Sequence, residues 1–255
     1  MKVFSSYHKD FIKKIATTIA IVAFWLAVWE IATVVIGSSL IIVSPRVAFA
    51  RLFALGQTAE FWRSIVTTMG RIVRGFGMAL VVGVTIAVVS AGVKIFHMLV
   101  LPAINVLNAV PFASFVVLAL FAMGAENLSV FVPFIMVLPI IFHNTYKGII
   151  STDPQLLEMA QVFRLPYWKK AVFIYAKSAA PFVFAAVQVG IGFAWKSGIA
   201  AELIGQVRGT IGGNLHTARI HLLTADLFAW TIAIVILSFI MEKLLGLVKW
   251  KGGER

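Results

Sequence analysis

Six long apolar stretches, separated by short polar segments, run through this chain of 255 residues. Hydrophobic residues make up 61% of the chain and charged residues only 13%, which is too few charges to cover a soluble domain. Lipid is therefore the solvent for most of the chain. Lipid offers the backbone no hydrogen bonds, and the stretches lack the alternation of a membrane barrel, so helices are expected. The sequence predicts an all-α integral membrane protein.

The six spans are expected at about 15–36, 67–93, 98–123, 128–142, 178–203 and 227–247. The first follows a basic tail, as a signal peptide does. However, it is long enough to cross a hydrocarbon core of roughly 30 Å and lacks a small-residue cleavage site, which predicts a retained anchor. Neither a repeat nor a low-complexity segment divides the chain. We therefore expect one transmembrane domain over residues 1–255, with its core at about 67–247.

Despite a net charge of +12, the basic residues are not gathered into the patch or tail of a nucleic-acid-binding protein but fall in the gaps between the spans. Gaps on one side of the membrane hold fourteen of them, including Lys249, Lys251 and Arg255, and gaps on the other side hold five. The positive-inside rule then places both termini and the 144–177 loop in the cytoplasm, with the 206–225 loop outside. The remaining three basic residues lie in or at the ends of spans, at Arg71, Arg74 and Lys196.

Two spans carry small residues at four-residue spacing. The second span has Ala79, Gly83, Ala87 and Ala91, and the fifth has Ala186, Gly190, Ala194 and Gly198. Such stripes let helix backbones approach closely in lipid. They indicate either packing within one subunit or a subunit or gate interface.

The polar segment at about 151–170 lies between two spans but carries helix signals. Asp153 followed by Pro154 is typical of a helix start, and Leu165-Pro166 is expected to end the helix. A second helical segment with Lys169 and Lys170 then leads to the fifth span. The first helix is either an amphipathic helix on the inner leaflet or a helix offered to a soluble partner. Its apolar face is predicted to contain Leu156, Ala160 and Phe163.

This segment and several others resemble one family of membrane proteins. In the loop, Glu158, Ala160, Ile174 and Pro181 stand where that family has its loop signature, with Arg164 in place of a glycine and Ala176-Lys177 in place of Leu-Pro. The wider resemblance rests on Ser44-Pro45, the segment from Thr68 to Gly75, Asn108 to Pro111, Phe142 to Asn144, Ala194-Trp195 and Ala201-Glu202. The chain resembles the permease subunits of binding-protein-dependent ABC importers, in their nitrate/sulfonate/taurine branch.

The resemblance implies the type I ABC importer permease fold, with six transmembrane helices and a cytoplasmic coupling helix. Such a subunit forms the path for a small solute that a soluble binding protein delivers from outside the bacterial inner membrane. It pairs with a second permease subunit, usually a copy of itself, and two cytoplasmic ATPase subunits bind ATP and Mg. An anion, a sulfonate or a vitamin precursor would each fit as the solute.

The resemblance also implies roles for particular residues. The residues expected to contact the ATPase are Leu156, Glu158, Ala160, Phe163 and Arg164. The fifth span lies along the translocation path, so Lys196 and Glu202 are candidate pore or gate residues. Glu202 continues the stripe from Gly198 and should face protein, whereas Lys196 lies on another face. Arginine adopts a left-handed turn only at a cost, so Pro166 is expected to break the helix in place of Arg164.

The sequence lacks the glycine-rich phosphate loop of ATPases and the common hydrolase motifs. We therefore expect no catalytic, cofactor-binding or metal-binding residue, and ATP hydrolysis in a separate subunit. An ion-coupled secondary transporter is one alternative, but Glu30 is its only acidic candidate and no inverted repeat is seen. A membrane scaffold or membrane enzyme is the other alternative.

Overall fold

A computed structural model describes residues 2–247, and every regular element among them is helical. The elements are α1 (Lys2–Ile36), α2 (Pro45–Gly56), α3 (Ala59–Gly92), α4 (Lys94–Ala109), α5 (Phe112–Met123), α6 (Ala125–Ile150), α7 (Pro154–Val162), α8 (Tyr167–Lys170), the π-helical turn η1 (Ala171–Tyr175), α9 (Ala176–Gly205), α10 (Ile211–Ile220) and α11 (Thr224–Leu247). The chain divides into two compact units: one comprises the residues up to Thr58 with Thr217–Ala233, and the other comprises Ala59–His216 with the residues from Ile234. Lys249, Lys251 and Arg255 lie outside the described residues.

Five of these helices are long and apolar enough to cross a membrane, and a sixth span results if α4 and α5 count as one. The five are Ala16–Ile36, Ala59–Gly92, Ala125–Ile150, Tyr167–Gly205 and Thr224–Leu244. The predicted all-α membrane fold is confirmed. None of the most apolar part of Ala16–Ile36 is buried, as a span surrounded by lipid requires.

The expected third span is not one continuous helix. It is broken between α4 and α5, whose axes differ by 106°. Val110 at the break is extended, with φ −70° and ψ 127°, because the ring of the following Pro111 disfavours a helical conformation there. The 12 residues of α5 reach only about 18 Å, so α5 cannot cross a bilayer alone.

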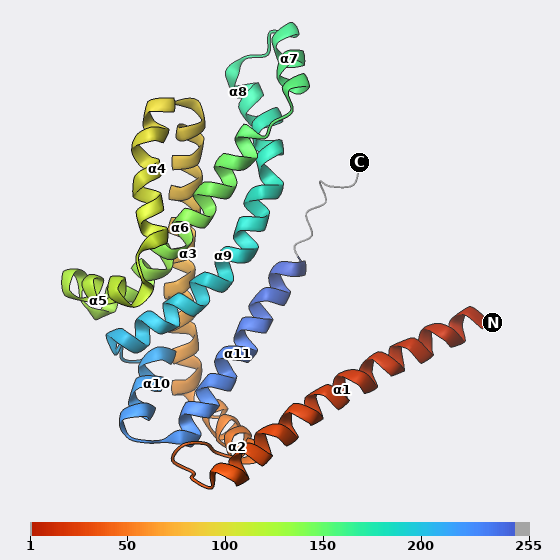
Figure 1. The fold of residues 1–255 in the computed structure, drawn as a ribbon, viewed down its shortest axis with the longest axis vertical. Coiled ribbons are helices and arrows are strands. Elements are labelled where there is room, and N and C mark those ends of the chain that lie inside the picture. Colours follow the sequence, from red (N-terminus) through yellow and green to blue (C-terminus); the bar gives the residue numbers. More distant parts are fainter. Residues whose placement is uncertain (1, 248–255) are drawn as a thin grey trace. The chain divides into compact units, whose positions relative to one another are not determined.

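Helices α3, α6 and α9 lie side by side in the second unit (Figure 1). Their contacts need residues without large side chains: a Cβ on Gly83 would lie 2.9 Å from Ile141, and one on Gly198 would lie 2.5 Å from Ile72. Gly190 similarly faces Val137. Apart from the half-buried Ala91, the residues of both stripes are buried. The stripes therefore serve packing within the subunit, the first of the two interpretations.

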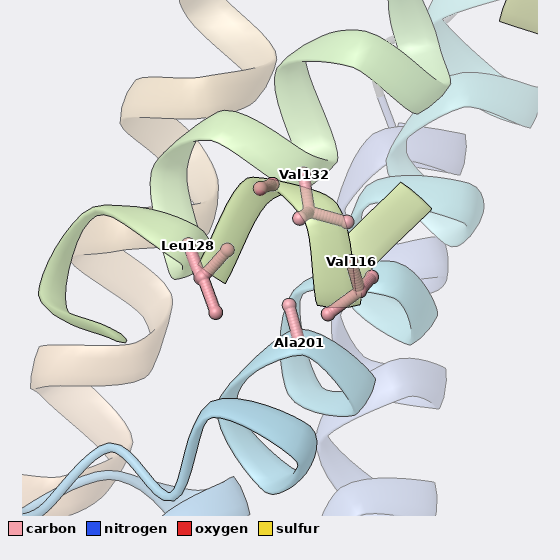
Figure 2. Close-up of a cluster of buried hydrophobic side chains, with 5 residues drawn as sticks. Val116, Leu128, Val132 and Ala201 are labelled. Atoms are coloured by element: carbon pink, nitrogen blue, oxygen red, sulfur yellow. The ribbon is translucent and has the colours of Figure 1, made fainter. Parts of the chain in front are cut away.

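A buried apolar cluster holds α5 against this three-helix core. Val116 and Ala119 of α5 meet Leu128 and Val132 of α6 and Ala201 of α9 (Figure 2). All five side chains are at most 5% exposed. The cluster fixes the short helix beside the end of α9 that carries Glu202.

The first unit is held by contacts around Trp29 and Arg51. The Trp29 indole N–H donates to the Val43 carbonyl at 2.9 Å, and its ring stacks on Phe228 with centroids 5.5 Å apart. Arg51 forms an ion pair with Asp226, in which Nη2 lies 3.1 Å from Oδ2. The hydrogen bond to Asp226 raises the pKa of the Arg51 guanidinium. These contacts join α1, α2 and the first turns of α11.

Candidate functional site

The polar segment forms a short helix with a well-defined start. The Asp153 carboxylate accepts a hydrogen bond from the Gln155 N–H at 2.9 Å, and Pro154 occupies the first helical turn. An aspartate cap satisfies an amide that the helix leaves free, and proline has no amide to lose there. The predicted start of this helix is confirmed.

Helix α7 ends at Val162, and the turn that terminates it is centred on Arg164, not on Pro166 as the sequence suggested. Arg164 adopts the left-handed conformation, with φ 48°. The Leu165 N–H donates to the Ala160 carbonyl at 2.9 Å, and the Arg164 N–H donates to the Gln161 carbonyl at 2.9 Å. This pair of bonds is the Schellman motif, in which the left-handed position is normally glycine. Pro166 instead precedes α8, which continues through η1 into α9.

The five residues expected to contact the ATPase differ in how much of each side chain is exposed. Ala160 is fully buried, Leu156 is 41% exposed and Phe163 is 71% exposed. Glu158 and Arg164 are exposed. Ala160 therefore supports the loop from within, and the surface offered to a partner comes from its neighbours.

Three exposed apolar side chains of this loop were not among the predicted contact residues. Val162 is 79% exposed, Tyr167 is 92% exposed and Trp168 is 62% exposed. Together with Phe163 they form what we call the loop patch: Val162, Phe163, Tyr167 and Trp168. The signal in the sequence was a pair of large apolar residues on each side of the helix break.

Glu202 lies at the other end of α9 and is fully buried. Its Oε2 accepts hydrogen bonds from the Thr68 hydroxyl at 2.9 Å and from the Gly212 N–H at 3.2 Å. The Thr68 oxygen in turn accepts from the Ile211 N–H at 3.0 Å. The second carboxylate oxygen of Glu202, Oε1, is buried and has no hydrogen-bond partner among the described residues. The prediction that Glu202 faces protein is confirmed, and its role in a gate stays a prediction.

This carboxylate joins three elements at a place where the backbone is closely packed. Helix α9 ends at Gly205. The next residue, Gln206, is left-handed with φ 55°, and the Val207 N–H donates to the Glu202 carbonyl at 3.1 Å. A Cβ on Gly212 would lie 2.4 Å from the Glu202 Cβ. Glycine is therefore needed where α10 begins. We call the group of Thr68, Glu202, Ile211 and Gly212 the Glu202 junction.

Lys196 belongs to a different face of α9. It is exposed, and within residues 2–247 its ammonium group has no hydrogen-bond or ion-pair partner. Gly192 and Gln188 precede it at four-residue steps, and Gln188 is also exposed. Exposed polar groups on a membrane helix are costly in lipid, so this face is suited to water or a partner. Gln188 was missed by sequence reasoning, although its spacing from Lys196 would have revealed it.

One helical rod connects the loop patch with the Glu202 junction. Residues Tyr167–Gly205 form a continuous helical segment of 39 residues, about 58 Å long at the usual helical rise. The loop patch and the Glu202 junction are therefore joined by a continuous helical backbone. The arrangement suits a chain that couples an event at one membrane face to a change at the other.

Comparison with known proteins agrees with this arrangement. The chain is 24% identical over 81% of its length to a probable ABC transporter permease protein of Brucella melitensis, of which it covers 84%. It is 28% identical to a bicarbonate transport system permease protein of Synechocystis sp., over 56% of this chain and 51% of that protein. It is 22% identical to a taurine transport system permease protein of Escherichia coli, over 90% of this chain and 86% of that protein.

The family itself is identified by a match over most of the membrane core. Residues 79–248 match the family described as the inner membrane component of binding-protein-dependent transport systems. The resemblance to permeases of the nitrate/sulfonate/taurine branch is confirmed by the similar proteins. This chain belongs to the family of inner membrane components of binding-protein-dependent transport systems, and it is a membrane-spanning permease subunit of an ABC transporter.

Proposed function

We propose that this permease works as a pair of identical subunits, with two cytoplasmic ATPase subunits and an extracytoplasmic solute-binding protein. In this arrangement both termini and helix α7 face the cytoplasm. The observation that carries the proposal is the loop patch, which lies where the capped helix α7 ends and α8 begins. Exposed aromatic and branched side chains on an ordered polar loop are typical of a protein interface.

The proposed coupling starts at α7. ATP binding draws the two ATPases together and moves the α7 helix seated on each of them. The movement passes through α8 and η1 into α9, which ends at the Glu202 junction. Changing the packing there alternates the access of the solute path between the two sides. ATP and Mg are bound by the partner subunits, and this chain supplies the moving helices.

The similar proteins suggest which solutes to test first. Their names assign them to nitrate, bicarbonate and taurine transport. These three solutes are the first candidates for this permease.

The coupling proposal is tested with Phe163→Asp in the co-expressed complex. A buried carboxylate at the interface should remove ATPase co-purification and solute-driven ATP hydrolysis, while the amount of permease in the membrane stays the same. Gln161→Asp is the matched control, because it adds the same charge on the same exposed helix. Normal ATPase binding by Phe163→Asp would show that the loop patch is not the docking surface.

The orientation is tested with single cysteines at Lys170 and Thr217, because the chain has no cysteine of its own. An impermeant thiol reagent applied to intact cells should label Thr217→Cys and should not label Lys170→Cys. The reverse pattern would invert the proposed topology. The mass of the intact complex then tests the assembly, for which two permease copies and two ATPases are expected.

A further inference from the structure

Three buried polar atoms, each on a different helix of the three-helix core, have no hydrogen-bond partner among residues 2–247. They are Nη1 of Arg71 on α3, Oγ of Ser129 on α6 and Oε1 of Glu202 on α9. A buried polar atom without a partner is costly, and the cost is highest for a charged group. Arg71 and Glu202 are therefore a cation and an anion that each have an interaction left to make.

Contacts between α3 and α9 bring Arg71 close to Glu202. Ile72 lies against Gly198, and one turn nearer the end of α9 the Thr68 hydroxyl donates to Glu202, so the two helices run antiparallel. Side chains lean toward the N-terminus of their own helix. Arg71 therefore leans toward Thr68, and Glu202 leans back toward Arg71. The charge of Arg71 accordingly acts on the Glu202 carboxylate.

Contacts between α6 and α9 place Ser129 at the same level. Leu128 of α6 lies against Gly205, since a Cβ on that glycine would lie 2.7 Å from the leucine. Ser129 follows Leu128, and Glu202 precedes Gly205 by three residues. Both side chains are fully buried. The unpartnered atoms of all three helices thus lie within about one helical turn of each other along the core.

The neighbouring hydroxyl of Thr210 does not supply a proton to the Glu202 Oε1 atom. Thr210 acts on this carboxylate, but its hydroxyl donates to the Val207 carbonyl at 2.7 Å. A hydroxyl has one proton to give, so it cannot donate to Oε1 at the same time. Among the described residues, Arg71 is the cation whose charge acts on Glu202.

Arg71 already has one acidic partner, at the start of α6. Its Nη2 donates to Oε2 of Glu126, whose side chain is 69% exposed. Water screens an ion pair with so exposed a partner, which then adds little stability, whereas a buried carboxylate depends on being paired. Arg71 thus lies between a weakly held partner at the surface, Glu126, and a buried partner that still lacks a donor, Glu202.

We propose that Arg71 exchanges partners during transport: it pairs with Glu126 in the observed conformation and with Glu202 in the other conformation of the cycle. The exchange moves the guanidinium group from the start of α6 to the end of α9, which is the helix that continues from the coupling loop. Each conformation then has an ion pair of its own, as in other two-state packing changes. The inference rests on the proposed function, because it names the residues that respond when α9 moves.

The exchange is tested by ATP hydrolysis of the complete complex, with and without the binding protein. Glu126→Gln removes the partner of the observed conformation, so hydrolysis without the binding protein should rise roughly threefold. Glu202→Gln removes the other partner, so stimulation by the binding protein should fall by a similar factor. Glu60→Gln is the control, because Glu60 is an exposed glutamate in the first turn of α3.

The opposite signs of the two effects separate an exchange from a purely structural role. A structural ion pair predicts that both substitutions lower the rate or leave it unchanged, and either result would overturn the proposal. Because Glu126 is on the surface, the sign of its effect decides the matter even if little Glu202→Gln complex assembles. In an Arg71→Gln background, neither glutamate substitution should have a further effect. Simple addition of the effects would also contradict the exchange.

A water molecule held by Arg71, Ser129 and Glu202 would satisfy the same atoms without any exchange. Ser129→Ala separates the two cases. Exchange predicts unaltered ATP hydrolysis in this variant, whereas loss of a water partner should reduce the stimulation as Glu202→Gln does, which would overturn the proposal. The proposed function has a separate test, because it fails if no ATPase subunit co-purifies with the unaltered permease.

Discussion

The two ends of the helical rod Tyr167–Gly205 differ in burial: the side chains at one end are packed within the chain, and those at the other end are exposed. At one end, the Glu202 carboxylate is fully buried and holds Thr68 and Gly212 by hydrogen bonds. At the other end, Tyr167 and Trp168 are largely exposed. The Glu202 junction is completed almost entirely by this chain, whereas the loop patch has apolar surface that the described residues leave uncovered. Substitutions at the junction should therefore change stability, and substitutions at the patch should change assembly.

The largest effect is expected for Gly212→Ala at the junction. The new Cβ would lie 2.4 Å from the Glu202 Cβ and 2.6 Å from the Leu203 nitrogen, and the backbone of α9 cannot move aside easily. The cost should exceed about 3 kcal/mol, the upper end for overpacking, and little folded permease should reach the membrane. Detergent gel filtration of a fluorescent fusion measures this. Gly70→Ala, which meets no atom within 4 Å, should fold normally.

The next effect is expected at the loop patch, for Tyr167→Ser combined with Trp168→Ser. Removing two exposed aromatic side chains takes away interface area without opening a cavity in the subunit. ATPase co-purification should fall at least tenfold while the melting temperature of the isolated permease stays unchanged. A lower melting temperature with normal ATPase binding would mean that the two ends do not differ in the way described.

An intermediate effect is expected for Glu202→Leu, compared with Glu202→Gln. Leucine leaves the Thr68 hydroxyl and the Gly212 N–H without an acceptor, at about 1–3 kcal/mol for each buried group. Glutamine keeps one side-chain oxygen, so its loss of stability should be smaller. Thermal unfolding of both variants in detergent ranks them.

If Glu202 also acts in a gate, Glu202→Gln should assemble normally but change the stimulation of ATP hydrolysis by the binding protein.

The smallest effect is expected for Arg164→Gly. Glycine relieves the left-handed strain of roughly 1–2 kcal/mol but loses more backbone entropy on folding, which leaves a gain of about 0.5 kcal/mol. Hydrogen exchange of the Leu165 amide, which bonds to Ala160, should slow accordingly. Arg164→Ala removes the same side chain but keeps the strain, so it should not slow the exchange.

The local signals in the sequence predicted much of this structure because each has one dominant cause. Asp153-Pro154 starts a helix because the cap and the missing amide act within a single turn. The small-residue stripes predicted close packing, and Gly83 and Gly198 show it. The burial of Glu202 followed from its place on one of these stripes.

Other features depend on contacts between distant segments, which periodicity does not contain. Ala160 shares a face with Leu156 by spacing, yet it is buried while Leu156 is not. Arg164 is left-handed although its own preference opposes this, because the Schellman bonds on either side hold it there. Glu202 has two hydrogen-bond partners: Thr68 lies 134 residues before it in the sequence, and Gly212 lies 10 residues after it, beyond the turn that ends α9. Helical propensity alone could not choose them.

The break before α5 has a consequence for the backbone inside the membrane. Interrupting a helix normally frees amide groups that hydrocarbon cannot hydrate. Here the Val110 N–H still donates to the Val106 carbonyl at 3.1 Å, and Pro111 has no N–H to leave unpaired. The Phe115 N–H returns to the Pro111 carbonyl at 3.2 Å, so the donors without a helical partner are confined to the first turn of α5. Pro111 therefore allows the chain to change direction within the membrane and leaves fewer unhydrated amides than any other residue at that position would leave.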